Sequence, residues 1–168
     1  SCKDTITKQH VVYPKLQPDF SFSDVCVSDQ VNISDQTTFT NTGIRKWLYK
    51  ANASDSFFVQ NPFFRYAAAG TYTIYQTLTS SEGCVYDTFK QIIVYPLPKV
   101  NFADSNKCID NRFRFYSILS IDTGVIKQVL WDFDDNTGST LLNPPHSFPS
   151  AGIYNVKLIA ESDFGCRD

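Results

Sequence analysis

Five cysteines supply the most reactive side chains of this 168-residue sequence, and their spacing is regular. Cys2, Cys84 and Cys166 follow one another at intervals of 82 residues, and Cys26 and Cys108 are separated by the same interval. Thiols can form disulfides, bind metal ions or act as nucleophiles. Zinc sites use closely spaced ligands, and the sequence has no Cys-x-x-Cys pair. Disulfides and buried free thiols are therefore the two interpretations that we consider further.

Two histidines are the other residues with catalytic potential. His10 and His146 are remote from each other in the sequence. No Gly-x-Ser-x-Gly, His-Glu-x-x-His or phosphate-binding glycine loop accompanies them. The sequence therefore predicts that this chain is not an enzyme.

An acidic turn contains Asp132, Asp134 and Asp135, whose carboxylate oxygens are the kind of ligand that Ca²⁺ prefers. A shift of 82 residues places Lys50 and Ala53 at the positions of Asp132 and Asp135. A calcium site that every repeat needed would not be lost in this way. We predict a turn with solvated carboxylates and no cofactor, and calcium binding is the alternative.

The 82-residue period extends well beyond the cysteines. The shift aligns identical residues in Val12-Tyr13-Pro14 and Val94-Tyr95-Pro96, in Asn61-Pro62 and Asn143-Pro144, and in Ala69-Gly70 and Ala151-Gly152. Several of these residues constrain backbone geometry. We predict that residues 1–15 are the C-terminal tail of a preceding repeat. Residues 16–98 then form a first, degenerate repeat, and residues 99–168 form a second repeat that lacks its final strand.

The composition predicts that each repeat folds from strands. The chain has 14 Phe, 9 Tyr and 2 Trp, and aromatic and β-branched residues favour strands. No window of helical length has apolar residues at helical spacing. Short alternating segments are separated by turn residues every 8 to 12 positions or so. This pattern predicts an all-β protein with immunoglobulin-like Greek-key β-sandwiches in tandem.

Charge and hydropathy exclude two classes of partner. The chain has 15 Lys and Arg against 17 Asp and Glu, for a net charge of -2. Because nucleic-acid binding draws on a basic excess, we predict no nucleic-acid partner. No apolar run is long enough for a transmembrane helix. A chain that contains no Met and starts with Ser-Cys is expected to be a processed product or an internal window of a longer protein.

Three motifs of the second repeat follow one another in a fixed order. They are Trp131-Asp-Phe-Asp-Asp135-Asn136, Asn143-Pro-Pro-His-Ser-Phe148 and Ala151-Gly-Ile-Tyr-Asn-Val-Lys-Leu158. Their order and spacing resemble those of the PKD (polycystic kidney disease) domain family, which prefers Gly at the positions of Asp134 and Asn136. The first repeat is a degenerate copy that keeps Asn61-Pro62 and Gly70-Thr-Tyr-Thr-Ile74. The cysteine-containing repeats look most similar to those of large surface proteins of Bacteroidota.

The resemblance implies PKD-type sandwiches in a non-catalytic extracellular module. We predict a structural and adhesive repeat of a cell-surface rod or filament, either secreted or held at the cell surface. The alternative is a glycan- or protein-binding accessory module of a secreted enzyme. The expected partners are neighbouring repeats of the same chain, laterally associated copies, or a surface glycan or protein.

The repeats also suggest a pairing for the cysteines. We predict disulfides Cys26–Cys84 and Cys108–Cys166, one within each repeat, and buried free thiols are the alternative. Cys2 stands at the repeat position of Cys84, so we expect its partner to lie outside this chain. Disulfides persist in oxidising compartments, which agrees with an extracellular location.

The first repeat carries large aromatic residues at Phe57, Phe58 and Phe63, where the second repeat has Ser, Thr and Pro. Aromatic surfaces bind sugars and partner proteins, but aromatic residues also fill sandwich cores. A core shared by both repeats would not explain an excess in one of them. We therefore predict that these three residues contact another chain or another module.

Each repeat also has a tyrosine two residues after a glycine, at Tyr72 and Tyr154. In β-sandwiches such a tyrosine can donate a hydrogen bond back across a turn, in the arrangement called a tyrosine corner. We therefore predict a structural role for both tyrosines.

Overall fold

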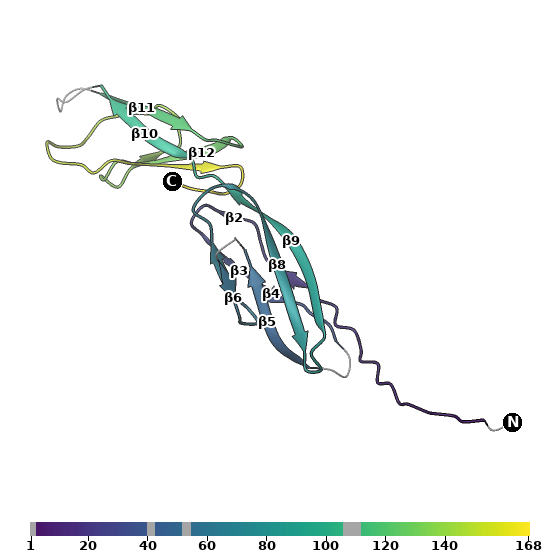
Figure 1. The fold of residues 1–168 in the computed structure, drawn as a ribbon. Helices are drawn as coiled ribbons and strands as arrows, with labels where there is room; N and C mark the ends of the chain where they lie inside the picture. The colour runs from purple at the N-terminus through teal and green to yellow at the C-terminus, as the bar shows by residue number, and fades with distance from the viewer. Residues whose placement is uncertain (1–2, 40–42, 52–54, 106–111) are drawn as a thin grey trace. The chain divides into compact units, whose positions relative to one another are not determined.

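A computed structural model describes residues 3–39, 43–51, 55–105 and 112–168. Among these residues the chain forms strands and no helix, which confirms the all-β prediction (Figure 1). It follows that the described residues contain no helix long and apolar enough to cross a bilayer. The strands are β1 (Phe20–Ser21), β2 (Val25–Cys26), β3 (Gln30–Asn32), β4 (Ser34–Asp35), β5 (Ile44–Lys50), β6 (Ser56–Phe57), β7 (Phe63–Arg65), β8 (Gly70–Ser80), β9 (Val85–Tyr95), β10 (Lys99–Asp104), β11 (Phe113–Ser120), β12 (Ile126–Asp132), β13 (Gly138–Ser139), β14 (Pro145–His146) and β15 (Lys157–Ser162).

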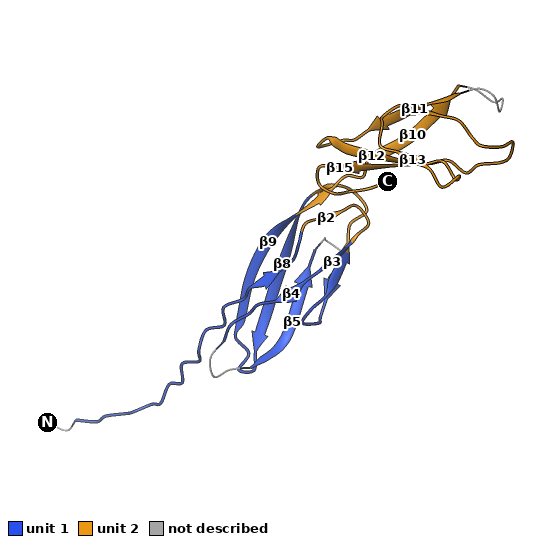
Figure 2. Cartoon of the chain, turned by 180° about the vertical axis from the view of Figure 1, so that it is seen from behind, with its two compact units in different colours: residues 1–23, 30–64, 71–92 blue, residues 24–29, 65–70, 93–168 orange. Residues whose placement is uncertain are grey.

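The chain divides into two compact units (Figure 2). Unit 1 consists of residues 1–23, 30–64 and 71–92, and unit 2 consists of residues 24–29, 65–70 and 93–168. Three short segments that the sequence period assigns to the first repeat thus group with unit 2. The repeat boundary between residues 98 and 99 stays a prediction.

The larger sheet of unit 1 has β9, β8, β5 and β6 as hydrogen-bonded neighbours in that order. The pairs β1–β4 and β3–β7 form the other layer of the sandwich. Strands β8 and β9 have 11 residues each and are joined by a turn in which Gly83 has a φ of 89°. Alternate apolar side chains of these strands fill the core, which contains Leu16, Phe20, Val31, Ile33, Tyr49, Phe64, Ile74, Leu78 and Ile92.

Unit 2 has two three-stranded sheets, ordered β10-β11-β14 and β13-β12-β15. Its core is centred on Trp131, which is 1% exposed and packs against Phe102 and Phe115 at ring distances of 5.1 and 5.4 Å. The remaining buried core residues are Val129, Phe133, Leu158 and Ala160.

Strands β5 and β12 match each other at the 82-residue shift. Both are seven residues long, and each has an irregular register directly after its first residue, Ile44 in β5 and Ile126 in β12. Ile44 pairs with Ser80 of β8, and Ile126 pairs with Ser162 of β15. The two strands therefore repeat not only in sequence but in bounds, bulge and partner.

A polar cluster lies inside the sandwich of unit 1, centred on the carboxylate of Asp35. Trp47 Nε1 and Gln76 Nε2 donate to this carboxylate at 2.8 and 3.0 Å, and Thr37 Oγ1 donates at 2.5 Å. Gln76 Nε2 also donates to the Tyr49 hydroxyl at 2.7 Å. Tyr49 and Gln76 are fully buried, so the cluster satisfies donors that have no access to water.

The cluster sets the charge state of its members. Burial alone would raise the pKa of the Asp35 carboxyl, but the hydrogen bonds from Thr37, Trp47 and Gln76 outweigh burial and hold this pKa below its ordinary value. Burial, together with the nearby Asp35 charge, raises the pKa of the Tyr49 hydroxyl. The charged Asp35 carboxylate is thus the form that the fold stabilises.

Replacing this carboxylate should destabilise unit 1. Asp35→Ala removes the acceptor of half-buried Trp47 Nε1 and one of the acceptors of buried Gln76 Nε2, which we expect to cost about 1–3 kcal/mol of unfolding free energy. A depressed pKa in the folded state contributes stability above the unfolded pKa of about 3.9, and this contribution is lost as pH falls through the folded value. The variant's deficit should therefore be full at pH 7 and smaller near pH 3.

Urea unfolding at both pH values, followed by tryptophan fluorescence, measures this deficit. Asp87→Ala is the matched control because Asp87 is exposed on the same unit. Equal stability of Asp35→Ala and wild type at pH 7 would show that the cluster does not stabilise the fold.

Candidate functional site

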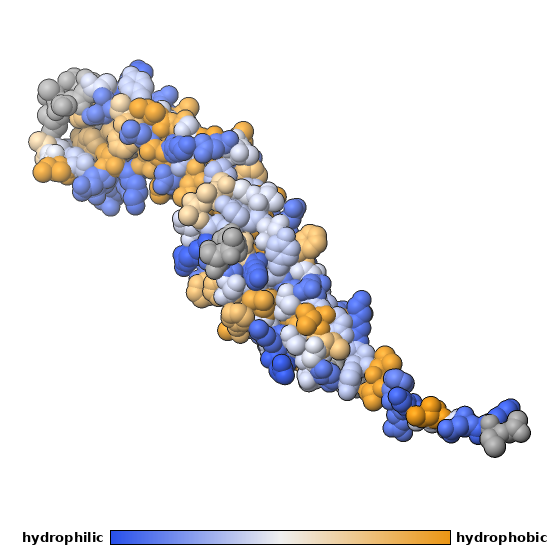
Figure 3. Space-filling model, viewed as in Figure 1, coloured by the Kyte–Doolittle hydropathy of each residue, from blue (hydrophilic) through white to orange (hydrophobic). Residues whose placement is uncertain are grey.

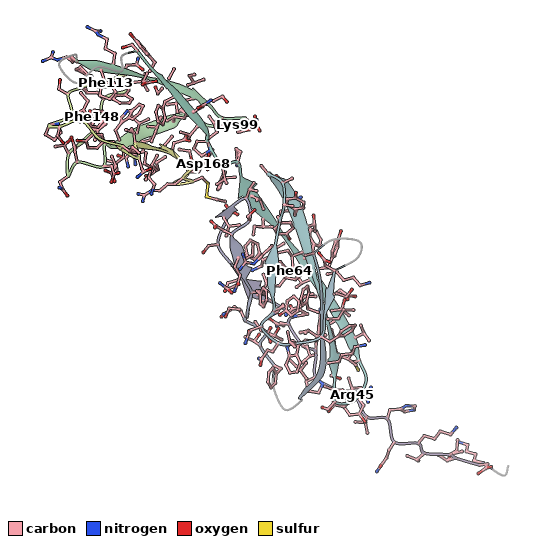
Figure 4. All side chains as sticks on the ribbon, turned by 90° about the vertical axis from the view of Figure 1, so that its left-hand side faces the viewer. Arg45, Phe64, Lys99, Phe113, Phe148 and Asp168 are labelled. Atoms are coloured by element: carbon pink, nitrogen blue, oxygen red, sulfur yellow. A yellow bond between two sulfur atoms is a disulfide. The ribbon has the colours of Figure 1, made fainter. Side chains whose placement is uncertain are left out.

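Unit 2 is closed by a disulfide between Cys26 and Cys166, whose Cα atoms lie 5.6 Å apart (Figure 4). Cys26 ends β2, which pairs in parallel with the last residues of β9. Cys166 is 1% exposed and lies just after β15, where its N–H donates to Ser162 Oγ at 3.2 Å. Beside the bond, Tyr95 stacks on Phe164 with ring centroids 4.0 Å apart. The disulfide joins residues that are 140 positions apart in the sequence.

The predicted Cys26–Cys84 bond is wrong, and strand β9 gives the reason. Cys26 pairs with Tyr95 at the C-terminal end of this strand, whereas Cys84 directly precedes Val85 at its N-terminal end. A strand of 11 residues spans about 36 Å. A disulfide requires Cα atoms within about 7 Å of each other. Cys84 is therefore a free, half-buried thiol.

The predicted Cys108–Cys166 bond is also wrong, because Cys166 is already bonded to Cys26. Cys108 and Cys2 lie outside the described residues. The expectation that Cys2 bonds outside this chain stays a prediction. The prediction placed each bond within one repeat, whereas the bond in the structure joins two cysteines that the sequence period assigns to different repeats.

The aromatic residues predicted to form an interface lie on unit 1. Phe57 is half-buried and packs edge-on against Phe64 at 4.9 Å. Phe58 and Phe63 are 61% and 52% exposed, and Lys46 Nζ lies 5.0 Å above the ring of Phe58. Two of the three residues are thus available at the surface. Their contact with another chain stays a prediction.

The carboxylates of the acidic turn accept hydrogen bonds within the protein. Asp132 accepts from the N–H of Asp134 at 3.0 Å, and Asp134 accepts from the backbone and side-chain nitrogens of Asn155 at 2.9 and 3.0 Å. Asp135 contacts His146 Nε2 at 2.8 Å. In the described part of the chain, no three His, Cys, Asp or Glu side chains converge as metal ligands would. This geometry is that of a turn, and calcium binding stays an untested alternative.

The backbone of this turn explains a feature of the sequence. Asp134 and Asn136 have φ values of 61° and 65°, in the left-handed region that favours glycine. These are the two positions at which the PKD family prefers Gly. Asp and Asn are the non-glycine residues that tolerate this region best. The departures from the motif therefore keep its backbone conformation.

His146 has a structural place beside the same turn. Its ring stacks on Phe133 at 3.9 Å and faces Asp135. A hydrogen bond from Thr137 is the largest cause that holds the pKa of the Asp135 carboxyl below its ordinary value. Burial opposes it, and the hydrogen bond with His146 lowers this pKa further. His10 lies outside the strands and is exposed.

Unit 2 also contains a cavity of about 660 Å³ that the sequence did not predict. We call it the aromatic groove, and we define it by its apolar lining residues Phe102, Phe113, Phe115, Phe148, Tyr154 and Val156. Figure 4 labels Phe113 and Phe148, which pack edge-on at 5.2 Å. Among the described residues of the lining, Asp104 is the only charged one, and Ser150 and Asn155 add polar groups.

Tyr154 fixes one wall of the aromatic groove. Its hydroxyl donates to the backbone oxygen of Ser150 at 3.0 Å, which confirms the predicted tyrosine corner for this residue. Its ring stacks on Phe148 at 4.1 Å. The wall is therefore held by a hydrogen bond and by ring packing.

Comparisons with known proteins bear on unit 2 above all. Residues 95–168 match the family model of the PKD domain, and this range contains the whole of the second predicted repeat, residues 99–168. The tandem arrangement stays a prediction. No curated protein matches the chain.

Three solved structures are similar in fold. The PKD1 domain of Vibrio anguillarum Epp is 16% identical, with a TM-score of 0.44, and the match covers 47% of this chain and 92% of that chain. The PKD1 domain of the Vibrio cholerae metalloprotease PrtV is 17% identical, with a TM-score of 0.41, and the match covers 49% and 98%. Fibronectin(III)-like modules of Clostridium thermocellum CbhA are 14% identical, with a TM-score of 0.45, and the match covers 91% and 88%.

The disulfide pairing can be tested by peptide mapping. We expect a proteolytic digest of the oxidised, alkylated chain to contain Cys26 linked to Cys166, and Cys84 to carry the alkyl group. A bond that closes a loop of this length stabilises a fold by about 5 kcal/mol on the chain-entropy estimate. Cys166→Ser should therefore lower the free energy of unfolding by up to that amount.

Cys84→Ser is the control, because it removes a thiol that forms no disulfide in this structure. The linked peptide should persist in this variant, and the unfolding free energy should stay close to that of wild type. A digest in which Cys26 is linked to Cys84 would contradict the assignment.

Proposed function

We propose that this chain is a non-catalytic structural module of an extracellular rod or filament, built to carry tension along its length. The observation that carries the proposal is the Cys26–Cys166 disulfide. Tension applied between the segment before Cys26 and the segment after Cys166 passes directly through the sulfur–sulfur bond. The residues between the two cysteines are then bypassed and cannot be drawn out.

The segment between the two cysteines is long, so the disulfide prevents a large extension of the chain. The bond spans a sequence separation of 140 residues, which when fully extended would reach about 480 Å. Without the bond, only non-covalent contacts would oppose that extension. A single covalent link thus removes most of the length by which the chain could yield.

The turns that hold Cys84 and Cys166 support the proposal that the same type of disulfide recurs along a longer chain. Ser80 N donates to Cys84 O at 2.9 Å and Cys84 N donates to Ser80 Oγ at 3.2 Å. Ser162 and Cys166 make the same two hydrogen bonds at the same distances. Cys84 therefore occupies a turn of the type that holds Cys166. In an array with this period, Cys84 would bond to a cysteine 140 residues earlier in a longer chain.

Two further observations support an extracellular location. Disulfides of this kind persist in oxidising compartments. Residues 95–168 match the PKD domain, and related PKD1 domains are found in a Vibrio metalloprotease. The alternative function is an accessory module of a secreted enzyme, in which the aromatic groove would bind a glycan, because aromatic faces pack well against sugar rings.

Single-molecule stretching tests the mechanical proposal. We expect the oxidised chain, held by its two termini, to resist extension between Cys26 and Cys166. Addition of reductant should then release about 480 Å of further length. Cys26→Ser should release the same length without reductant, and Cys84→Ser should behave as wild type. Full extension of the oxidised wild-type chain would exclude a role of this bond in carrying tension.

Antibody labelling separates the two functions. An antibody against this chain should label projections on intact, unpermeabilised cells of the source organism if the chain is part of a rod or filament. Label found only in the culture medium, on a particle that also carries enzymatic activity, would instead support the accessory module.

A further inference from the structure

The larger sheet of unit 1 carries aromatic rings on the face that points away from the core. Strand β8 buries Ile74 and Gln76, so Tyr75 between them lies on the opposite face, because side chains alternate along a strand. The ring of Tyr75 lies 5.9 Å from that of Phe89 on β9. Tyr75 and Phe89 are 53% and 63% exposed. Both rings are therefore available to a ligand.

Two lysines of β5 lie on the same face. Lys50 pairs directly with Tyr75, and residues that pair across neighbouring strands share a face. Lys46 lies four residues before Lys50 and shares that face by alternation. Its Nζ lies 5.0 Å from the centre of the exposed ring of Phe58. We call this surface the cationic aromatic face, and we define it by Lys46, Lys50, Phe58, Tyr75 and Phe89.

The charges of this sheet are unbalanced. Strands β5, β6, β8 and β9 contain the basic residues Arg45, Lys46, Lys50 and Lys90 but only one acidic residue, Asp87. Among the described residues, Lys90 is the only one of these four basic residues that forms an ion pair. Lys46 and Lys50 are exposed and have no carboxylate partner in that part of the chain. The cationic aromatic face is therefore complementary to a ligand with negative charges.

Hydroxyl and amide groups lie between the rings. Thr73 and Thr77 flank Tyr75 at two residues' distance on β8, and Gln91 follows Phe89 at the same distance on β9. Alternation places all three on the cationic aromatic face. On the side of unit 1 that Figure 3 shows, apolar side chains likewise lie between polar ones. Protein interfaces bury a more continuous apolar centre, so this surface is better suited to a ligand that is itself polar.

We propose that the cationic aromatic face binds an acidic polysaccharide, a chain of hexuronic acid residues. The rings of Phe58, Tyr75 and Phe89 stack on the apolar faces of the sugar rings. Lys46 and Lys50 pair with the carboxylates of the sugars. The neighbouring threonine and glutamine side chains exchange hydrogen bonds with the sugar hydroxyls. This binding activity goes beyond the proposed mechanical role and does not depend on it.

The dimensions of the face require a polymer. Lys46 and Lys50 are separated by about 13 Å along their strand. Phe89 lies two strands away from Lys50, across about 10 Å, because β8 stands between β9 and β5. A single sugar covers one ring and reaches one lysine. Exposed ion pairs contribute little each, so binding needs a chain of several sugars that engages all five side chains.

The ligand needs both its charges and its sugar rings. A neutral glycan stacks on Tyr75 and Phe89 but leaves Lys46 and Lys50 without an anion. An acidic peptide pairs with the two lysines but offers no ring face to the aromatic residues. Binding of a neutral glycan, of an acidic peptide or of a second copy of this chain are therefore the competing outcomes of the experiment.

The experiment measures binding of the chain to immobilised polygalacturonate by interferometry. It uses all 168 residues with Cys2, Cys84 and Cys108 replaced by serine, so that no disulfide links two copies. We expect binding that weakens as salt rises, because exposed charges are screened within about 10 Å at 0.1 M salt. Failure of the chain to bind polygalacturonate at low salt would overturn the proposal.

Two further polymers separate the parts of the ligand. Fully methyl-esterified polygalacturonate keeps the sugar chain without its charges, and polyglutamate keeps the carboxylates without the sugars. Each should bind roughly 10-fold more weakly than polygalacturonate, which corresponds to about 1.4 kcal/mol. Equal binding of the ester would show a neutral-glycan site, and equal binding of polyglutamate would show recognition of charge alone. Either result would overturn the proposal.

A double substitution tests the two lysines. Lys46→Gln with Lys50→Gln should weaken binding to polygalacturonate roughly 10-fold, as expected for the loss of two exposed ion pairs. Lys127→Gln with Lys157→Gln is the matched control, because it removes the same charge from exposed residues of unit 2. Equal weakening by both double variants would show a general charge effect and would contradict a site on this face.

Phe89→Ala tests the rings. It should weaken binding about 5-fold through the loss of one stacking contact. Phe63→Ala is the control, because Phe63 is similarly exposed, at 52%, but belongs to β7 outside this sheet. Both variants should unfold at the same urea concentration as wild type, since both side chains are exposed. Equal binding of the Phe89→Ala variant and wild type would show that the site lies elsewhere.

Sedimentation velocity without polysaccharide tests the second copy as occupant. We expect a monomer at the concentrations used for binding. Self-association that Phe89→Ala abolishes would show that another copy covers this face, which would overturn the proposal. The stretching experiment on the Cys26–Cys166 bond is independent of these measurements, so the failure of one proposal is distinguishable from the failure of the other.

Discussion

Alternating burial along the strands is the constraint on which both units depend. Strand β8 buries Gln76 and Leu78 and exposes or half-buries the residues between and beside them. Strand β15 buries Leu158 and Ala160, which the 82-residue shift assigns to the same two positions. Because each strand contributes only every second side chain to the core, each sandwich needs all its strands to close. In unit 2, Phe102, Phe113 and Phe148 are only half-buried, and they line the aromatic groove.

The sequence was sufficient to predict the architecture because its signals are local. Alternation, turn residues and the motifs around Trp131 and Tyr154 each depend on neighbours a few positions away, and the structure is all-β with a tyrosine corner at Tyr154. The strand expected to begin at Gly152 begins only at Lys157. The residue types also predicted that Asp134 and Asn136 lie in a turn, and both residues have positive φ values in the structure. The fold class and the second repeat's family resemblance followed from these signals.

The disulfide could not be predicted in the same way. Equal spacing of cysteines shows which positions correspond, but it does not show whether a bond forms within a repeat or between repeats. That choice depends on which end of β9 each cysteine is near, and hence on the parallel pairing of Cys26 with Tyr95. The aromatic groove was missed for a related reason. Phe102, Phe113 and Phe148 look like ordinary core residues in the sequence, and only their half-burial in the structure shows that they line a cavity.

The disulfide crosses the boundary that the sequence period sets between the two predicted repeats. Unit 2 takes in residues 24–29 and 65–70 from the first repeat and binds one of these segments covalently through Cys26. A module whose core needs residues from outside its own repeat gains stability when repeats are joined.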